Sequence, residues 1–193
     1  EVSSGNTLTF NGKVKAGLDN RTGTLLLDPK NITIGSGSGE ISSAVFATSA
    51  SDDSTIAAST INSTLSAGTN VVLQANNDIT VSSPITASNS GNGGDLALQA
   101  GRSVLVNANI TTDNGDLTLT ANETTSNGVV TAERDSGAAV ITLGSAIDTG
   151  TGTFRLTISA GTGRSGSKIT SGDITLSTIT AGSLVVTNSG PTS

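Results

Sequence analysis

Short stretches of alternating apolar and polar residues run along most of the chain, and clusters of Gly, Asn, Asp and Ser separate them. Alternation with a period of two predicts a β-strand with one buried face. Gly and Asn tolerate the positive φ angles that sharp corners need. The pattern therefore predicts many short strands joined by tight corners.

The strand pattern recurs in register. The segment Asn70–Thr86 aligns with Asp95–Thr111 at an offset of 25 residues, and Val104–Leu119 returns without a gap at Ile141–Leu156, at an offset of 37. A repeat of roughly 21–25 residues that holds about three short strands is typical of one coil of a β-helix. We therefore expect the extra residues of the longer offset to form an inserted loop at 124–138.

A degenerate copy of the pattern follows at Ile174-Thr-Leu176, Ile179, Leu184 and Val186, and the phrase Gly-Asp-(Leu/Ile)-x-Leu begins at Gly94, Gly115 and Gly172. The predicted fold is all-β: residues 1–193 form one segment of a right-handed, single-stranded parallel β-helix. Its expected core consists of aliphatic residues and one Phe: Val71, Leu73, Ile79, Val81, Ile85, Leu96, Leu98, Val104, Val106, Ile110, Leu117, Leu119, Ile141, Leu143, Ile147, Phe154, Leu156, Ile174 and Leu176.

Other stretches depart from the alternating pattern. Residues 35–54 and 161–172 are rich in Gly and Ser and are predicted to be loops. Near residues 56–66 a short helix is predicted, because Ile61 and Leu65 lie four positions apart and Gly68 is placed to end it. Ser and Thr, which are frequent there, are poor helix formers.

The amino-acid composition excludes most of the residue types that carry out catalysis. The chain has no Cys, His, Met, Trp or Tyr, so it offers no thiolate nucleophile, imidazole base or His/Cys metal ligand. Nine scattered basic residues and a net charge of −6 argue against nucleic-acid binding. No apolar run approaches the roughly 20 residues that span a bilayer. Because the chain begins at Glu1 without Met, we expect it to be part of a longer protein or a mature product.

Several acidic residues are candidates for a site. Asp78 and Arg102 fall one position apart in adjacent coils, which predicts a surface ion pair at a corner rather than catalytic chemistry. Paired carboxylates for glycoside hydrolysis need a separation of about 5–9.5 Å in a cleft. Asp52 with Asp53, and Asp113 with Asp116, are interpreted as turn acids instead. The run 91–95 lacks the nine-residue aspartate repeat of a calcium β-roll. No enzyme activity, metal or cofactor is predicted.

Three phrases resemble filamentous-haemagglutinin-like large exoproteins, which include the high-molecular-weight adhesins of two-partner secretion. They are Thr24–Ile34, Gly68–Val81 and Gly94–Val104, and they occur in order. The resemblance implies a long parallel β-helix that is secreted and displayed on the surface of a Gram-negative bacterium. It also implies a host-cell or surface glycan or protein receptor, and an outer-membrane transporter for the full-length protein. The Asn-Pro-Asn-type motif of the family's secretion domain is absent, which indicates a segment of the passenger shaft.

The functional hypothesis is a non-enzymatic structural and adhesive shaft segment, with neither nucleic-acid binding nor membrane insertion. Two alternatives stay open: a polysaccharide-acting β-helix enzyme, and a scaffold or biofilm protein that self-associates through its coil ends. Some members of the resembled family are glycosylated at Asn-x-Ser/Thr sequons. The candidate glycosylation sites in this chain are Asn20, Asn31, Asn62, Asn109 and Asn122.

Overall fold

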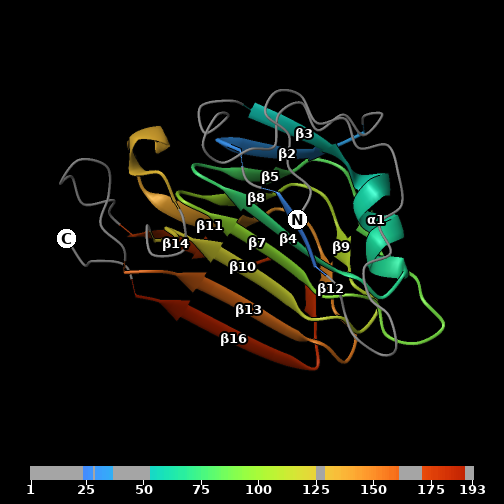
Figure 1. The fold of residues 1–193 in the computed structure, drawn as a ribbon. Helices are drawn as coiled ribbons and strands as arrows, with labels where there is room; N and C mark the ends of the chain where they lie inside the picture. Colours follow the sequence, from blue (N-terminus) through green and yellow to red (C-terminus); the bar gives the residue numbers. More distant parts are fainter. Residues whose placement is uncertain (1–23, 28, 37–52, 125–128, 161–170, 190–193) are drawn as a thin grey trace.

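The computed structural model describes residues 24–27, 29–36, 53–124, 129–160 and 171–189 (Figure 1). Two six-stranded sheets and one four-stranded sheet make up the fold, and every strand pairing in these residues is parallel. The predicted all-β parallel class is confirmed.

Within each sheet the strands are given in the order in which they lie side by side. Sheet A contains β1 (Thr24–Leu27), β4 (Asn70–Ala75), β7 (Leu96–Ala100), β10 (Leu117–Ala121), β13 (Thr153–Ile158) and β16 (Ser183–Asn188). Sheet B contains β14 (Ser171–Thr175), β11 (Ala139–Leu143), β8 (Val104–Val106), β5 (Ile79–Val81), β2 (Asn31–Gly35) and β3 (Asp53–Ala57). Sheet C contains β15 (Ile179–Thr180), β12 (Ile147–Asp148), β9 (Ile110–Thr111) and β6 (Ile85–Thr86).

The chain visits sheets A, B and C in turn, and we call one such round a repeat. Four rounds follow this order, beginning at β4, β7, β10 and β13. The predicted offsets are the observed registers: Val71 is the Cα partner of Leu96, and Leu117 is the partner of Phe154. Adjacent repeats therefore differ in length because extra residues lie in loops outside the paired strands, as between β10 and β11.

Inward-facing side chains form continuous columns because the registers are aligned. In sheet A, Leu73, Leu98 and Leu119 occupy matched positions, and all three are fully buried. Each residue of the predicted core from Val71 to Leu156 is at most 2% exposed. The columns from the three sheets meet in one hydrophobic cluster, so the repeats share a single core.

The predicted core fails in the last repeat. Ile174 is only half-buried, and Leu176, which follows β14, is 46% exposed, so its assignment to the core was wrong. Strands β14, β15 and β16 lie at the outer edges of their sheets, with no described strand beyond them. A side chain needs neighbours in the repeats on both sides to be buried, and the last repeat has them on one side.

A helix, α1 (Ala58–Ser66), closes the opposite end of the core. It begins two residues later than the predicted range because Ile56 still belongs to β3. Ile61 and Leu65 are 1% and 0% exposed. At the C-terminus of α1, Gly68 has a φ of +72° and donates its N–H to Leu65, while Thr69 donates to Thr64. This is a Schellman motif, which confirms the predicted stop.

The predicted loops 35–54 and 161–172 lie mostly outside the described residues. The predicted ranges of these loops were too long, because they include residues that belong to strands. Gly35 closes β2, Asp53 and Ser54 open β3, and Ser171 and Gly172 open β14. Polar residues join these strands because they continue the register of a neighbouring strand, which composition does not reveal.

A column of glycines marks the corner that precedes strands β7, β10, β13 and β16 of sheet A. Gly94, Gly115, Gly152 and Gly182 stack on one another or on a neighbouring carbonyl so closely that a Cβ atom would overlap it. The phrase that begins at Gly172 does not belong to this column. Gly172 lies in β14 of sheet B, and the matching corner residue is Gly182.

Truncation of one core residue tests the columns. Leu98→Ala is expected to lower the free energy of unfolding by about 2–5 kcal/mol, because it leaves a cavity between Leu73 and Leu119. The control Thr118→Ala, on the outward face of the same sheet, should cost about 0.5 kcal/mol or less. Urea unfolding followed by circular dichroism measures both, and equal effects would contradict the inward column.

Candidate functional site

Polar side chains at the corners form ladders that run from repeat to repeat. In front of the strands of sheet B, Asn31 Oδ1 accepts the N–H of Asp78 at 3.0 Å, and Asp78 Oδ1 accepts that of Ser103 at 3.1 Å. Ser103 Oγ then accepts the N–H of Val140 at 3.2 Å. In each case the residue that donates its N–H is aligned, in the register of sheet B, with the residue that accepts it, and it lies in the adjacent repeat.

The same device precedes the strands of sheet A. Asn70 Oδ1 accepts the N–H of Asp95 at 2.8 Å, Asp95 Oδ1 that of Asp116 at 2.9 Å, and Asp116 Oδ1 that of Thr153 at 2.7 Å. A backbone N–H without a partner is costly, and side-chain oxygens supply an acceptor where the chain turns. The corner Asn and Asp residues therefore join neighbouring repeats as well as allowing the turn.

The described part of the inserted loop, residues 129–138, lies along the corner between sheets A and B, and we call it the clasp. It contains a 3₁₀ turn at Thr131–Glu133. Val130 donates its N–H to Asn76 Oδ1 at 2.8 Å, and Asp135 donates its N–H to Asn77 Oδ1 at 3.0 Å. Both Asn side chains are 1% exposed. The predicted loop thus exists, but it is bonded to the corner rather than projecting freely.

One ion pair and one hydrogen bond from an arginine hold the clasp to two other repeats. Asp135 pairs with Lys30 at 3.2 Å. Arg102 forms the predicted pair with Asp78, through Nε at 2.8 Å and through Nη2 at 2.5 Å, and its Nη1 donates to the carbonyl of Ser136 at 3.0 Å. The hydrogen bond to Asp78 raises the pKa of Arg102 above its ordinary value, while burial acts in the opposite direction. This pair is half-buried and links two repeats to the clasp.

Arg134 is the most enclosed charge of the clasp, at 1% exposure. It donates from Nη2 to Oδ1 of Asn122, which is itself fully buried at a positive φ of 52°. Burial lowers the pKa of Arg134, and the charge of Glu123, which is 6% exposed, opposes that effect. Sequence reasoning missed this residue. No periodic signal in the sequence marks it, because Arg134 lies in the irregular clasp.

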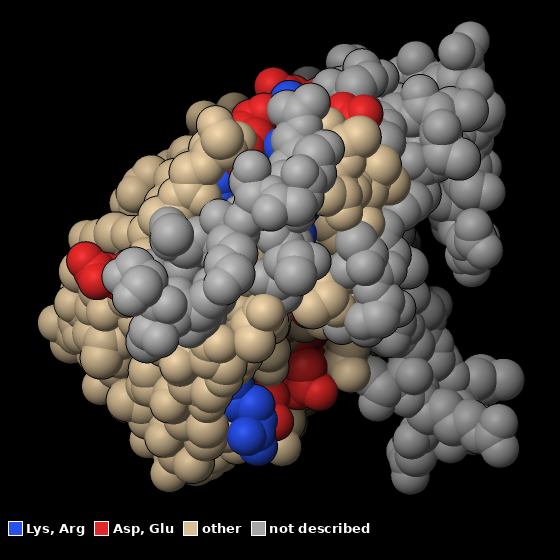
Figure 2. All heavy atoms as spheres, turned by 90° about the vertical axis from the view of Figure 1, so that its left-hand side faces the viewer, with Lys and Arg blue, Asp and Glu red and all other residues tan. Residues whose placement is uncertain are grey.

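The face that carries the clasp holds acidic and basic side chains in small mixed groups on a largely uncharged surface (Figure 2). Lys30, Arg102 and Arg134 lie there with the acidic residues Asp78, Glu123, Glu133 and Asp135. Such a mixed network gives neither sign of charge a continuous field. It fits a role in fixing the corner better than the capture of a charged polymer.

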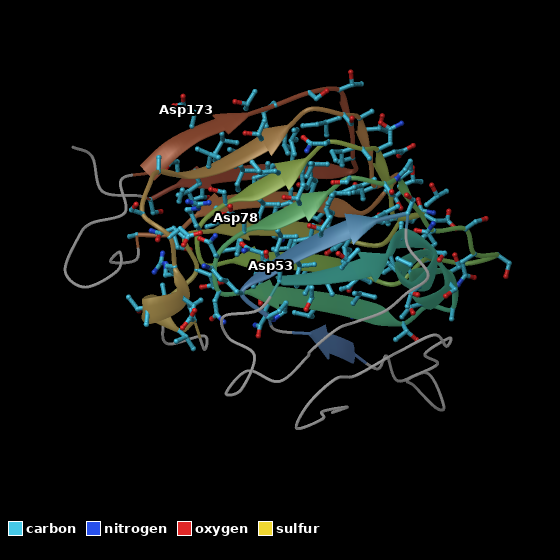
Figure 3. The ribbon with its side chains drawn as sticks, turned by 90° about the horizontal axis from the view of Figure 1, so that it is seen from above. Asp53, Asp78 and Asp173 are labelled. Carbon is cyan, nitrogen blue, oxygen red and sulfur yellow. The ribbon has the colours of Figure 1, made fainter. Side chains whose placement is uncertain are left out.

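The other acidic candidates are dispersed. Asp53 in β3, Asp78 before β5 and Asp173 in β14 lie on different strands along sheet B (Figure 3). Asp53 accepts a hydrogen bond from Asn31 Nδ2 at 2.6 Å, and Asp113, at a φ of 55°, accepts the N–H of Asn89. Asp52 lies outside the described residues.

No arrangement of acidic residues forms a metal centre in the described part of the chain, where no three Asp or Glu side chains are grouped for one. A depression of about 230 Å³ lies over the outer face of sheet A. Its lining residues are Asn70, Val71, Val72, Asp95, Leu96, Ala97, Asp116 and Thr118. Asp95 and Asp116, which line this depression, each use Oδ1 to accept a main-chain N–H of the ladder.

The sequons differ in access. Asn20 lies outside the described residues. Asn31 and Asn62 are half-buried, and their Oδ1 atoms accept the N–H groups of Asp78 and Thr86. Asn109 is exposed, although its Oδ1 accepts the N–H of Ala146 at 3.1 Å. Asn122 is fully buried, so the folded chain has no room for a glycan there.

No protein-family model matches the chain, and neither the curated proteins nor the solved structures contain a significant match. Within the described residues, no helix has the length and apolar character needed to cross a membrane. The family resemblance therefore rests on the phrases Thr24–Ile34, Gly68–Val81 and Gly94–Val104.

The ladder can be tested at one step. Asp95→Ala removes the acceptor for the exposed N–H of Asp116 and should lower the free energy of unfolding by about 0.5–1.5 kcal/mol. Asp95→Asn keeps a side-chain oxygen and should recover most of that loss. Chemical denaturation of both variants gives the comparison. Equal losses in the two variants would mean that the charge, and not the acceptor, is what matters.

A second prediction concerns the buried charges beneath the clasp. Arg134→Met removes the guanidinium that attracts the buried carboxylate of Glu123, and should cost about 3–5 kcal/mol of stability. Adding Glu123→Gln should restore a large part of this. Arg155→Met, which makes the same change at an exposed position, should cost about 0.5 kcal/mol or less. If the double variant is no more stable than Arg134→Met alone, the two charges are not coupled.

Proposed function

We propose that the three parallel sheets are the faces of a right-handed, single-stranded parallel β-helix. The support is the order in which the chain visits them, A to B to C, with each strand pairing in register with its equivalent in the next repeat. The proposed hand follows from a general rule, since about 98% of crossovers between parallel strands of one sheet are right-handed.

The proposed function is that of a non-enzymatic shaft segment. The single observation that carries it is the unbroken aliphatic column, in which Leu73, Leu98, Leu119 and Leu156 stack repeat on repeat. Such a stack resists bending because each repeat is bonded to its neighbours along all three sheets. The corner ladders and the clasp add side-chain bonds in the same direction.

We place this shaft in a secreted adhesin displayed on the surface of a Gram-negative bacterium and exported by two-partner secretion. The resemblance to filamentous-haemagglutinin-like exoproteins supports this setting. The outward side chains of sheet A are mostly Thr, Gln and other uncharged residues, which suits a surface that faces water over a long distance. The proposed partners are an outer-membrane transporter for the full-length protein and a host-cell or surface glycan or protein receptor.

Adhesion can be tested directly. Beads coated with the chain are expected to bind cultured epithelial cells saturably, and soluble chain should compete with them. Beads coated with Leu98→Ala should bind fewer cells when the assay temperature, in buffer without urea, exceeds the temperature at which half of this variant is unfolded. The reason is that the receptor-binding surface requires the folded stack. Equal binding by coated and uncoated beads would reject the adhesive role.

The enzyme alternative has a separate readout. The chain is incubated with acidic polysaccharides, and new reducing ends are measured over time. Turnover that is lost in Asp78→Asn, Asp95→Asn or Asp116→Asn, which keep the side-chain oxygen that the ladder uses, would replace the shaft proposal by a catalytic one. The shaft proposal expects no release above the polysaccharide alone.

A further inference from the structure

Side chains from two adjacent repeats and from the clasp meet at the corner that precedes sheet B. The register that pairs Ile32 with Ile79 also aligns Lys30 with Asn77, and Asn77 donates its N–H to the carbonyl of Lys30 at 2.8 Å. Aligned residues of neighbouring strands lie about 4.8 Å apart. The side chains of Lys30 and Asn77 therefore leave the backbone next to each other, and Asp135 of the clasp contacts both.

The carboxylate of Asp135 bridges the amine of Lys30 and the side-chain amide of Asn77. Its Oδ1 pairs with Lys30 Nζ at 3.2 Å, and its Oδ2 accepts a hydrogen bond from Asn77 Nδ2 at 2.9 Å. A carboxylate held between two nitrogens can take a proton from one and give a proton to the other. Asp135 is therefore placed to act as both base and acid between these two groups.

The amide of Asn77 is held in one orientation and is polarised. Its Oδ1 accepts the N–H of Asp135 at 3.0 Å, and its Nδ2 also donates to Asn31 Oδ1 at 2.9 Å. An N–H at Oδ1 stabilises the negative charge that develops there when a nucleophile adds to the amide carbon. The side chain of Asn77 is 1% exposed, so the amide lies out of contact with bulk water.

We propose that Lys30 and Asn77 form an intramolecular isopeptide bond, with Asp135 as the acid–base group. Nζ of Lys30 attacks Cγ of Asn77, the Nζ–Cγ bond forms, and the Cγ–Nδ2 bond breaks. The two protons that the Lys30 ammonium loses pass through the Asp135 carboxylate to Nδ2, which leaves as ammonium. One amide replaces another, so the step needs no oxidant, reductant or further reactant.

The fold supplies what this reaction lacks in a free peptide. Groups held together in the correct geometry react as if one were present at a very high effective concentration, on the order of 10⁵ M or more. The bond forms once in the life of each molecule, so even a slow step completes it. The product links two adjacent repeats covalently beneath the clasp and closes residues 30–77 into a ring.

The next aligned position of the same corner offers a comparison within the chain. Arg102 donates its N–H to the carbonyl of Asn77 at 2.7 Å, and its side chain pairs with Asp78. A guanidinium keeps its proton in proteins and does not act as a nucleophile. The ion pair at this neighbouring position therefore stays an ion pair, whereas the amine of Lys30 can react.

Intact-mass spectrometry of the folded chain tests the bond. After incubation at neutral pH, the chain should be lighter than its sequence by the mass of one ammonia molecule. Trypsin should no longer cut after Lys30, so the fragment 22–102, which contains no other Lys or Arg before Arg102, should stay in one piece. Fragmentation of this peptide should place the link between Lys30 and Asn77. Chain kept unfolded in urea should retain its full mass.

Three variants separate the chemistry from a structural effect. Lys30→Arg keeps the positive charge beside Asp135 and should retain the full sequence mass. Asp135→Asn removes the acid–base group and should slow the loss of ammonia by about 100-fold or more. The matched control Asp53→Asn changes a carboxylate that accepts a hydrogen bond from Asn31, and should leave the rate unchanged. Circular dichroism shows whether each variant is folded.

Three results would overturn the proposal. The first is a folded chain that keeps its full sequence mass, and the second is a rate in folded Asp135→Asn equal to that of the unaltered chain. The third is a loss of ammonia that persists in Lys30→Arg, which would indicate a succinimide at an Asn-Gly sequence such as Asn92-Gly93 or Asn114-Gly115. None of these results affects the shaft proposal, which rests on the aliphatic columns.

Discussion

Every feature of this fold depends on the parallel pairing of each repeat with the one before it. A single repeat holds strands of two to six residues and a handful of aliphatic side chains, too little to offset the entropy of ordering its backbone. Stacked repeats share both hydrogen bonds and apolar contacts, so stability grows with the number of neighbours. Burial accordingly depends on position in the stack: Leu156 is fully enclosed, whereas its register partner Val186 in the last repeat is 46% exposed.

Corners are the costly part of such a stack, because the strands end there while their backbone groups still need partners. The chain meets this need with Asn, Asp and Ser side chains that accept the N–H of the equivalent residue in the next repeat. Where the corner between sheets A and B is most polar, the clasp covers it and supplies additional partners to Asn76 and Asn77. Glycines serve the adjoining corner, where a neighbouring carbonyl lies too close for any side chain.

Much of the fold could be predicted from the sequence, because the offsets of 25 and 37 residues recur as observed registers. Alternation identified the buried face of each strand through Leu156, and Gly68 identified the end of α1. The rest needed three dimensions. Leu176 is exposed because no strand among the described residues covers it. Gly182, and not Gly172, belongs to the glycine column because it precedes a strand of sheet A, whereas Gly172 lies in a strand of sheet B. Burial of Arg134 depends on how an irregular loop lies on distant corners, for which the sequence carries no periodic signal.

The central claim, that successive repeats stack in parallel register, has a direct spectroscopic test. Spin labels on cysteines introduced at Val72 and Val185 would lie on the same face of sheet A, four strands apart. With labelled chain diluted in unlabelled chain, double electron–electron resonance should give one narrow distance distribution near about 19 Å, four strand spacings of ~4.8 Å. A broad distribution, or one centred well away from that distance, would show that the repeats do not stack in this order.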